Sequence, residues 1–253
     1  SFHFPGFARE RLTGAPAKTT IQSSAENPKP RILPARQPHC PDPLPAGALM
    51  EPRLVPTPRS LADIELKTRE IIGRGWGRIE RFVFRHKRFD DTWSEDVTRD
   101  VYTIAEVVNV LPWDPKLGAV VLIEQFRTCG LVWGEATWLF EAVAGIREEG
   151  EAPEDVACRE AEEEAGCEIG RLHPVSTVWS SPGGYGERAS LFIGEADLSA
   201  VGGIHGLAHE HEDIRAVVVP LAEALQATKD GRITDTKTIL LIQWLVLNSK
   251  GIA

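Results

Sequence analysis

A short acidic stretch carries the residues whose types and spacing could do chemistry. Residues 145–167 pass from a glycine-containing loop into a segment dominated by glutamate. The helix predicted over residues 153–165 places Glu160 and Glu164 on one face, because they lie four positions apart, with Glu163 beside them. Like charges at this spacing cost about 0.2–0.5 kcal/mol per pair in an isolated helix. A divalent cation would offset that cost, and clustered carboxylate oxygens suit Mg²⁺ or Mn²⁺.

The same glutamates also fit a simpler structure, the solvated acidic face of a helix that ends at a glycine. That structure is the commoner reason for a bare run of glutamates. The wider spacing favours chemistry instead. The fixed polar and glycine residues are Gly145, Glu151, Arg159, Glu160, Glu163, Glu164 and Gly166, with Ala161 and Cys167 at apolar positions. These residues fill every fixed polar and glycine position of the Nudix box, and the chain therefore resembles the Nudix family.

The resemblance covers nearly all of residues 50–252, and within the family it is to the bacterial ADP-ribose pyrophosphatases. Pro182 lies where members that cleave ADP-ribose carry a proline. Members of this kind are about as long as the chain counted from Met50. The stretches that carry the resemblance are residues 81–86, 121–127, 138–145, 181–184, 186–188 and 203–208.

The resemblance implies a site for two or three Mg²⁺ ions, with Mn²⁺ as a substitute. Glu160 and Glu164 would be metal ligands together with the backbone carbonyl of Ala144, and Glu163 would be a catalytic residue in the same cluster. Pyrophosphate cleavage needs the substrate's charge neutralised and a water molecule deprotonated in line with the leaving group. Arg159 would orient the glutamates, although its spacing alone fits a surface ion pair equally well.

A second acidic segment, residues 209–213, is predicted to be a mobile loop before the strand at residues 214–220. The resemblance makes Glu210 a catalytic glutamate and Glu212 a metal-associated one. A base on a loop is physically reasonable, because closure can assemble the water-activating geometry after substrate and metal have bound. An ordinary solvated loop is the alternative.

The resemblance also assigns residues that would bind a nucleoside diphosphate sugar. Arg127 and Arg99 match arginines that contact ADP-ribose in similar enzymes, and Trp76 matches an aromatic residue that stacks on adenine. Taken alone, Trp76 is more simply a core or interface aromatic. In the resembling enzymes the N-terminal strands cross onto a partner subunit, so Trp76 and Arg99 would serve the neighbour's site. The chain would then be a homodimer with shared active sites.

Three further positions match residues near the substrate in the family. They are Pro182, Glu141 and Glu187, although Glu187 could instead pair with Arg188. Other positions depart from the family pattern and could reshape the pocket for the terminal sugar. These are Trp133, Gly134, Trp138 and Cys167.

The function implied is Mg²⁺-dependent hydrolysis of ADP-ribose to AMP and ribose 5-phosphate. One alternative keeps the chemistry and changes the substrate to another nucleoside diphosphate sugar, such as GDP-mannose. A second alternative is a catalytically silent module that senses ADP-ribose. The intact glutamates at positions 160, 163, 164 and 210 speak against that module.

The elements that must position these residues are short strands interrupted by single helices. Strands are predicted at residues 63–72, 77–86, 97–105, 107–111, 119–125, 139–142, 175–180, 189–195 and 214–220. A turn is predicted at residues 112–115, and helices at residues 153–165, 221–229 and 234–248. Pro153 suits a first helical turn, Gly166 and Gly231 suit helix ends, and Thr234 or Asp235 could cap the last helix. The resulting fold class is α/β, a Nudix α/β/α sandwich with a mixed sheet and a small N-terminal β-rich region that mediates dimerisation.

Composition divides the chain into three parts. Residues 1–49 hold nine of the eighteen prolines and are predicted to be a disordered extension, or to precede a translation start at Met50, the only methionine. Residues 50–105 would form the dimerisation region, and residues 106–253 the hydrolase domain. The net charge is −9, and residues 50–253 alone carry about −12, which argues against nucleic-acid binding and favours cations as partners.

Cysteine usage and hydropathy indicate the compartment. The four cysteines show neither CxxC spacing nor a cluster with histidine, which is typical of a reduced protein without structural zinc. No apolar run is long enough for a membrane span, and the N-terminus lacks the apolar core of a signal peptide. The sequence therefore predicts a soluble cytoplasmic protein.

Overall fold

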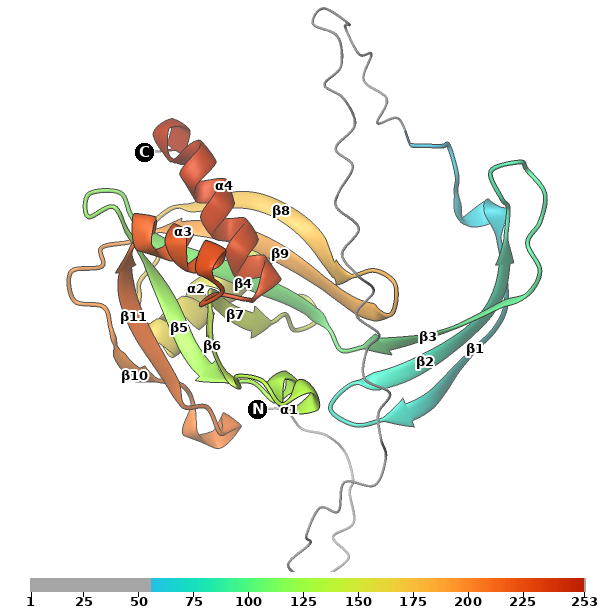
Figure 1. Ribbon diagram of the computed structural model, residues 1–253, viewed down its shortest axis with the longest axis horizontal. Coiled ribbons are helices and arrows are strands. Elements are labelled where there is room, and N and C mark those ends of the chain that lie inside the picture. Colours follow the sequence, from blue (N-terminus) through green and yellow to red (C-terminus); the bar gives the residue numbers. More distant parts are fainter. Residues whose placement is uncertain (1–55, 253) are drawn as a thin grey trace, which may run out of the picture. The chain divides into compact units, whose positions relative to one another are not determined.

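The computed structural model describes residues 56–252. The predictions for residues 1–49 and for a start at Met50 lie outside the described residues. Eleven strands form one sheet in the order β1-β2-β3-β9-β4-β5-β11-β10, with β6, β7 and β8 paired to β5, β4 and β9 (Figure 1). The strands are β1 Ile64–Arg74, β2 Arg78–His86, β3 Val97–Thr103, β4 Glu106–Asp114, β5 Ala119–Phe126, β6 Trp138–Glu141, β7 Val143–Ile146, β8 Leu172–Ser181, β9 Tyr185–Glu195, β10 Gly203–His205 and β11 Ile214–Pro220.

The sheet is mixed, as the sequence predicts. Strand β9 pairs in parallel with β4 along eight residue pairs, from Glu106 with Arg188 to Trp113 with Glu195. The pairs β4 with β7 and β5 with β11 are antiparallel. Strand β7 therefore lies next to β4, one of the most buried strands of the sheet.

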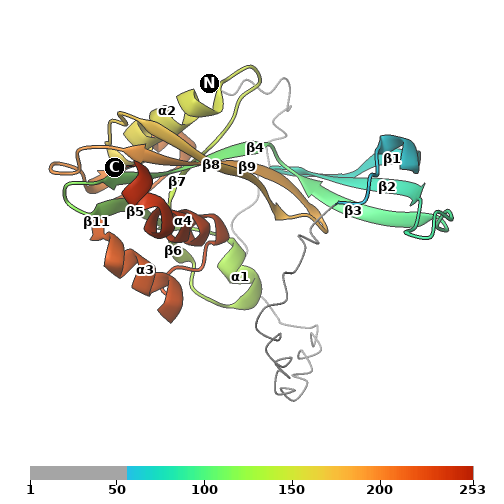
Figure 2. The same ribbon diagram turned by 90° about the horizontal axis from the view of Figure 1, so that it is seen from above.

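Helices cover both faces of the sheet. In Figure 2, α2 lies on one side of the strands, and α3 and α4 lie on the other. Alternate residues of β4 follow this division, because Val108 and Val110 pack in the cluster with α2 whereas Leu111 packs in the cluster with α4. The helices are α1 Cys129–Trp133, α2 Pro153–Ala165, α3 Leu221–Asp230 and α4 Thr236–Ile252, with short 3₁₀ turns at Leu61–Asp63 and Ala208–Glu210.

Helix α2 begins and ends where the sequence predicts. Pro153 occupies its first turn, and Gly166 follows it in the left-handed conformation with φ 59°. A side chain at position 166 would also approach the His205 ring closely, so glycine is required there twice over. Val156 and Ala161 are fully buried toward the sheet, which leaves the glutamates on the flank of the helix.

One local prediction is wrong. The turn expected at residues 112–115 is strand up to Asp114, and Pro112 pairs with Gly194 of β9. On its other side β4 has just left β7 at Val110 and first meets β5 at Trp113, so the missing N–H of Pro112 interrupts no ladder there. The strand expected at residues 139–142 corresponds to β6, whereas β7 and α1 are elements that the sequence analysis does not predict.

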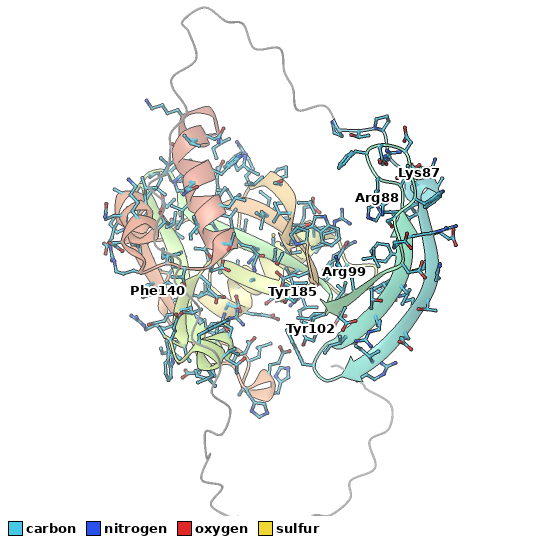
Figure 3. The ribbon with its side chains drawn as sticks, turned by 45° about the vertical axis from the view of Figure 1, so that its right-hand side comes forward. Lys87, Arg88, Arg99, Tyr102, Phe140 and Tyr185 are labelled. Atoms are coloured by element: carbon cyan, nitrogen blue, oxygen red, sulfur yellow. The ribbon has the colours of Figure 1, made fainter. Side chains whose placement is uncertain are left out.

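The N-terminal strands β1, β2 and β3 form an antiparallel unit that joins the rest of the sheet through β3 and β9. The pairing consists of Tyr102 opposite Tyr185, and the backbone N–H of Tyr102 also donates to the carbonyl of Gly184. These are the only two tyrosines of the chain. Their rings stack with centroids 6.0 Å apart and planes 9° apart (Figure 3).

None of the helices in the described range 56–252 is both long and apolar enough to cross a membrane. Three cysteines fall in that range, and each is a free thiol: Cys129 and Cys158 are exposed, and Cys167 is buried beneath α2.

Candidate active site

The glutamates of α2 meet the backbone of β7. The carboxylate of Glu164 accepts a hydrogen bond from the backbone N–H of Ala144, 2.9 Å away. The carboxylate of Glu160 lies against Gly145, and a Cβ at position 145 would overlap it. Glycine is therefore required at position 145 for the helix to bring its carboxylates against the strand, which explains its place at the start of the motif.

Arg159 holds three of the motif's carboxylates. Its guanidinium contacts Glu160 at 2.8 Å, Glu163 at 3.1 Å and Glu151 at 3.3 Å. Because Arg159 contacts three carboxylates at once, it orients the cluster and is not one member of an isolated surface ion pair. Its single positive charge cannot neutralise three carboxylates as well as the neighbouring Glu164.

Glu164 is 3% exposed. Its side chain is therefore packed against β7 rather than presented to solvent. Burial raises the pKa of Glu164 well above its usual range; the Ala144 N–H opposes this rise, and the charges of Glu160 and Glu212 reinforce it. The ionised form of a carboxyl group buried in this way would be stabilised by a nearby positive charge.

The pKa of Glu160 is raised as well. Burial raises the pKa of Glu160 to about 7, against the opposing effect of Arg159, and the charges of Glu163 and Glu212 add to the rise. Four carboxylates from two segments therefore interact in one place: Glu160, Glu163 and Glu164 from α2, and Glu212 from the loop before β11.

The donor set fits a hard divalent cation. Carboxylate and carbonyl oxygens are the ligands of Mg²⁺ and Mn²⁺, and a cation placed here would supply the charge that Arg159 does not. Glu160 lies against Gly145, and Glu164 lies beside Ala144. Both carboxylates are therefore next to the backbone of β7. Within residues 56–252, no three acidic, histidine or cysteine side chains are already arranged around one point as ligands, so binding would require rotamer changes.

The loop before β11 brings only one of its two predicted glutamates to the cluster. Glu212 accepts a hydrogen bond from the backbone N–H of Leu207 at 3.1 Å, and its charge acts on Glu160 and Glu164. Glu210 lies at the end of a 3₁₀ turn, is 46% exposed at its side chain and contacts His209. No ion pair or hydrogen bond links Glu210 to an α2 residue within the described part of the chain.

Arg127 and Glu141 form a tight ion pair beside the cluster. The guanidinium donates three hydrogen bonds to the carboxylate, the shortest 2.7 Å long. Arg127 follows β5 and Glu141 ends β6, so the pairing of these two strands brings the side chains together. The charge of Glu164 also acts on Arg127, which places the ion pair next to the candidate metal ligands.

Three other predicted residues lie on exposed turns or strands. Trp76 is 77% exposed in the turn between β1 and β2, and Arg99 is exposed on β3 with its guanidinium donating to the carbonyl of Thr98 (Figure 3). Pro182 is exposed in the turn between β8 and β9. Nothing in the described part of one chain draws Trp76 or Arg99 to the glutamates of α2.

Glu187 is 8% exposed and pairs with Lys237 at 3.2 Å. The hydroxyl groups of Ser180 and Tyr185 also donate to its carboxylate. The alternative of a pair with Arg188 does not hold, because Arg188 contacts Glu106.

Sequence reasoning missed the first turn of α4. Lys237 joins Glu187 to Asp235, and the adjacent Thr238 is fully buried against the start of β7. The available signal was a polar stretch, Asp-Thr-Lys-Thr, that opens an otherwise apolar helix.

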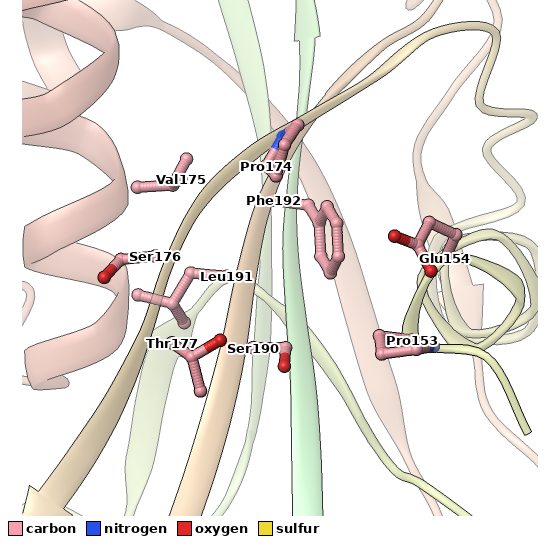
Figure 4. A pocket seen from close by; sticks show the side chains of 9 residues that line it. All are labelled: Pro153, Glu154, Pro174, Val175, Ser176, Thr177, Ser190, Leu191 and Phe192. Carbon is pink, nitrogen blue, oxygen red and sulfur yellow. The ribbon is translucent and has the colours of Figure 1, made fainter.

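Two surface pockets lie away from these residues. One, of about 290 Å³, is formed by β8, β9 and the start of α2, with Pro153, Pro174 and Phe192 in its wall (Figure 4). The other, of about 660 Å³, lies beyond the end of α2 and includes Lys116 and Arg171. Neither is lined by a residue predicted for the site.

The segment around α1, where we expect departures from the family pattern, carries exposed tryptophans. Trp133 and Trp138 are 76% and 63% exposed, and the ring of Trp138 packs edge-on against Phe126 with centroids 5.2 Å apart. Arg127 and Glu141 flank this segment in the sequence.

Comparisons with known proteins identify relatives. A family model described as "NUDIX domain" matches residues 103–240. The chain is 40% identical over 204 residues to an ADP-ribose pyrophosphatase of Escherichia coli, which covers 81% of this chain and 98% of the relative. It is 41% identical over 192 residues to one of Haemophilus influenzae, covering 75% and 88%.

Two further proteins are similar to this chain at lower sequence identity. A GDP-mannose pyrophosphatase of Pectobacterium atrosepticum is 32% identical over 189 residues, covering 73% of this chain and 94% of the relative. A solved structure described as an ADP compounds hydrolase superposes with a TM-score of 0.58 at 18% sequence identity, covering 77% of this chain and all of that one. The second likeness confirms the fold alone.

Replacing Glu164 with glutamine keeps the shape of the side chain and removes its charge. Without divalent ions, Glu164→Gln should unfold at the wild-type temperature or above it, because burial no longer penalises a charge. Saturating Mn²⁺ should raise the wild-type midpoint by about 5–10 °C and the variant's by much less. Differential scanning fluorimetry checks both.

The exposed Glu162 on the same helix provides the matched control. Glu162→Gln should respond to Mn²⁺ as the wild type does. If Glu164→Gln unfolds at a much lower temperature without metal, or keeps the full response to Mn²⁺, the assignment of Glu164 as a metal ligand is wrong.

Proposed function

This chain belongs to the Nudix family, and we propose that it is a divalent-cation-dependent pyrophosphohydrolase that cleaves ADP-ribose to AMP and ribose 5-phosphate. The carboxylates of the partly buried Glu160 and the buried Glu164, held against the backbone of β7, carry the chemical part of the proposal. The two relatives named ADP-ribose pyrophosphatases, each at least 40% identical, support the substrate.

Mg²⁺ is the proposed cofactor, and Mn²⁺ would substitute for it. The ions would be held by Glu160 and Glu164 of α2, the carbonyl of Ala144 in β7 and Glu212 of the loop before β11, because Glu164 contacts Ala144 and the charge of Glu212 acts on both α2 carboxyl groups. Bound Mg²⁺ would neutralise the diphosphate and increase the electrophilicity of its phosphorus atoms. Arg159 would keep Glu160 and Glu163 aligned while ions and substrate exchange.

The reaction needs one proton acceptor. A water oxygen forms a bond to one phosphorus, the bond between that phosphorus and the bridging oxygen breaks, and the bridging oxygen leaves with the other phosphate. Glu210 would accept the proton lost by the water, and Glu163 would assist within the cluster. The exposed position of Glu210 suits a base that arrives when the loop closes over the substrate.

Arg127, Glu141, Pro182 and Glu187 would line the substrate's path. Arg127 is already oriented by three hydrogen bonds from Glu141, so it could contact a phosphate at little cost in side-chain entropy. Pro182 lies at the turn before β9, and Glu187 follows it on the strand. Glu187 accepts from Ser180 and Tyr185 on either side of this turn, so it would hold the turn in place as well as contact the substrate.

Trp76 and Arg99 would serve the active site of a second copy of the chain, and residues 50–105 would mediate this homodimer. The exposure of Trp76, together with Ile64, Leu66 and Ile71 on β1, supports an apolar interface in this region. Sedimentation equilibrium at micromolar concentration should give the mass of a dimer. A monomer mass would contradict shared sites.

GDP-mannose is the second candidate substrate. It is favoured by the relative named a GDP-mannose pyrophosphatase, whose identity to this chain is lower at 32%. A silent sensing module would have no need for four interacting carboxylates. The cytoplasmic location stays a prediction from the sequence.

A panel of nucleoside diphosphate sugars, each with Mg²⁺ and with a chelator, tests the substrate. We expect kcat/KM for ADP-ribose to exceed that for GDP-mannose by about tenfold or more, with AMP as a product and no turnover in chelator. Preference for GDP-mannose would reassign the substrate. Binding of ADP-ribose without turnover would favour the sensing module.

Glu210→Gln tests the base. The variant should lose about 100-fold or more in kcat, because general base catalysis contributes about 10²–10⁴-fold. Its affinity for Mn²⁺ should stay close to that of the wild type, since Glu210 is not a proposed ligand. Glu223→Gln, which changes an exposed carboxylate on α3, serves as the control. A parallel loss of metal affinity, or a normal kcat, would remove Glu210 from this role.

A further inference from the structure

The edge of the sheet that carries Ala144 contains a change of strand partner. Up to Glu141 the chain pairs with β5, where Glu141 lies opposite Ile123. From Val143 onward it pairs with β4, where Val143 lies opposite Val110. Ala142, between the two ladders, is fully buried, so its backbone N–H needs another acceptor.

Thr238 supplies that acceptor. Its hydroxyl oxygen lies 2.7 Å from the backbone nitrogen of Ala142, a contact across 96 positions of sequence. The hydroxyl in turn donates to the carboxylate of Asp235 at 2.7 Å, and the backbone N–H of Thr238 donates to the same oxygen at 2.8 Å. Because the hydroxyl hydrogen points to Asp235, the lone pairs of the hydroxyl oxygen are free to accept from the N–H of Ala142.

This contact lies between the two functional pairs of the site. The residue before Ala142 is Glu141, the partner of Arg127. Two residues after Ala142, the N–H of Ala144 donates to Glu164. A shift of the bend would therefore move the carbonyl of Ala144 and the carboxylate of Glu141 together.

Thr238 is held firmly enough to fix the bend. It is fully buried, and Leu241 and Ile242 on the next turn of α4 are buried in the core between helix and sheet. Asp235 is held from its other side by Lys237, which also contacts Glu187. The first turn of α4 is therefore anchored to β9 as well as to the sheet core.

We infer that Thr238 is a positioning residue of the metal centre: through the N–H of Ala142 it sets the bend that presents the carbonyl of Ala144 beside Glu164. The inference rests on the proposed function for its metal, and it adds a residue outside the Nudix box to the determinants of metal affinity. Residues that orient metal ligands without touching the ion change affinity or activity by about 10–100-fold when replaced.

A buried threonine could also serve packing alone, and matched variants separate the two roles. Thr238→Val keeps the volume and removes the hydroxyl, whereas Thr238→Ser keeps the hydroxyl and removes a methyl group. Ile242→Val trims the same helix face without touching the bend and controls for loss of stability. For each protein, electron paramagnetic resonance measures the dissociation constant of Mn²⁺, scanning fluorimetry the midpoint, and steady-state kinetics kcat and KM.

We expect Thr238→Val to weaken Mn²⁺ binding and lower kcat by about tenfold or more, with KM for ADP-ribose changed less than about threefold at saturating metal. Thr238→Ser should stay within about threefold of the wild type in metal affinity and kcat. Ile242→Val should bind Mn²⁺ as the wild type does even where its midpoint falls.

Wild-type affinity for Mn²⁺ and wild-type kcat in Thr238→Val, with only a lower midpoint, would overturn the inference. If Thr238→Val does not fold, Asp235→Ala replaces it, because it removes the acceptor that orients the hydroxyl; unchanged metal affinity and kcat there would overturn the inference equally. The Mn²⁺ measurement is independent of turnover. Failure of the wild type to hydrolyse ADP-ribose would therefore refute the proposed function without deciding the role of Thr238.

Discussion

The candidate site depends on two carboxyl groups packed against one short strand. Helix α2 brings the partly buried Glu160 and the buried Glu164 onto the backbone at Ala144 and Gly145, where loss of solvation raises the pKa of both groups. The N–H of Ala144 and the guanidinium of Arg159 compensate only part of the cost. A site that is unfavourable by itself and favourable with a cation is what tight binding of a divalent ion requires, because the binding energy relieves a penalty that folding has already imposed.

The sheet makes this burial possible. Strands β4 and β5 and the second half of β9 are largely buried on both faces, so β7 rests on the packed centre of the sheet. The change of partner between β6 and β7 then turns the chain at the sheet's edge, where the backbone of Ala144 faces the helix. Strand β7 pairs with β4 along Val143–Ile146, and the N–H of Ala144 is left to donate to Glu164 of α2.

The sequence determines the helix and its carboxylates better than it determines their surroundings. Pro153, the buried Val156 and Gly166 define α2 locally, and the predicted bounds agree with the structure. The strand at Pro112 was predicted as a turn, because only the neighbouring strands decide whether its missing N–H matters. The break at Ala142 was missed for the same reason, since strand exchange depends on residues far apart in the sequence. Burial of Glu164 likewise follows from packing against β7 and not from helical periodicity.

The position of Thr238 shows how such long-range structure leaves a trace in composition. Helix α4 is apolar around most of its circumference, and a threonine in line with Leu241, Ile242 and Leu245 occupies a place where leucine or valine would pack as well. A hydroxyl group there costs burial free energy unless it has both a donor and an acceptor as partners. Asp235 supplies the acceptor three positions earlier, but the donor, the N–H of Ala142, can be found only from the fold. The hydroxyl in this otherwise apolar helix face is thus explained by the backbone N–H opposite it, which belongs to the bend beside the candidate metal-binding glutamates.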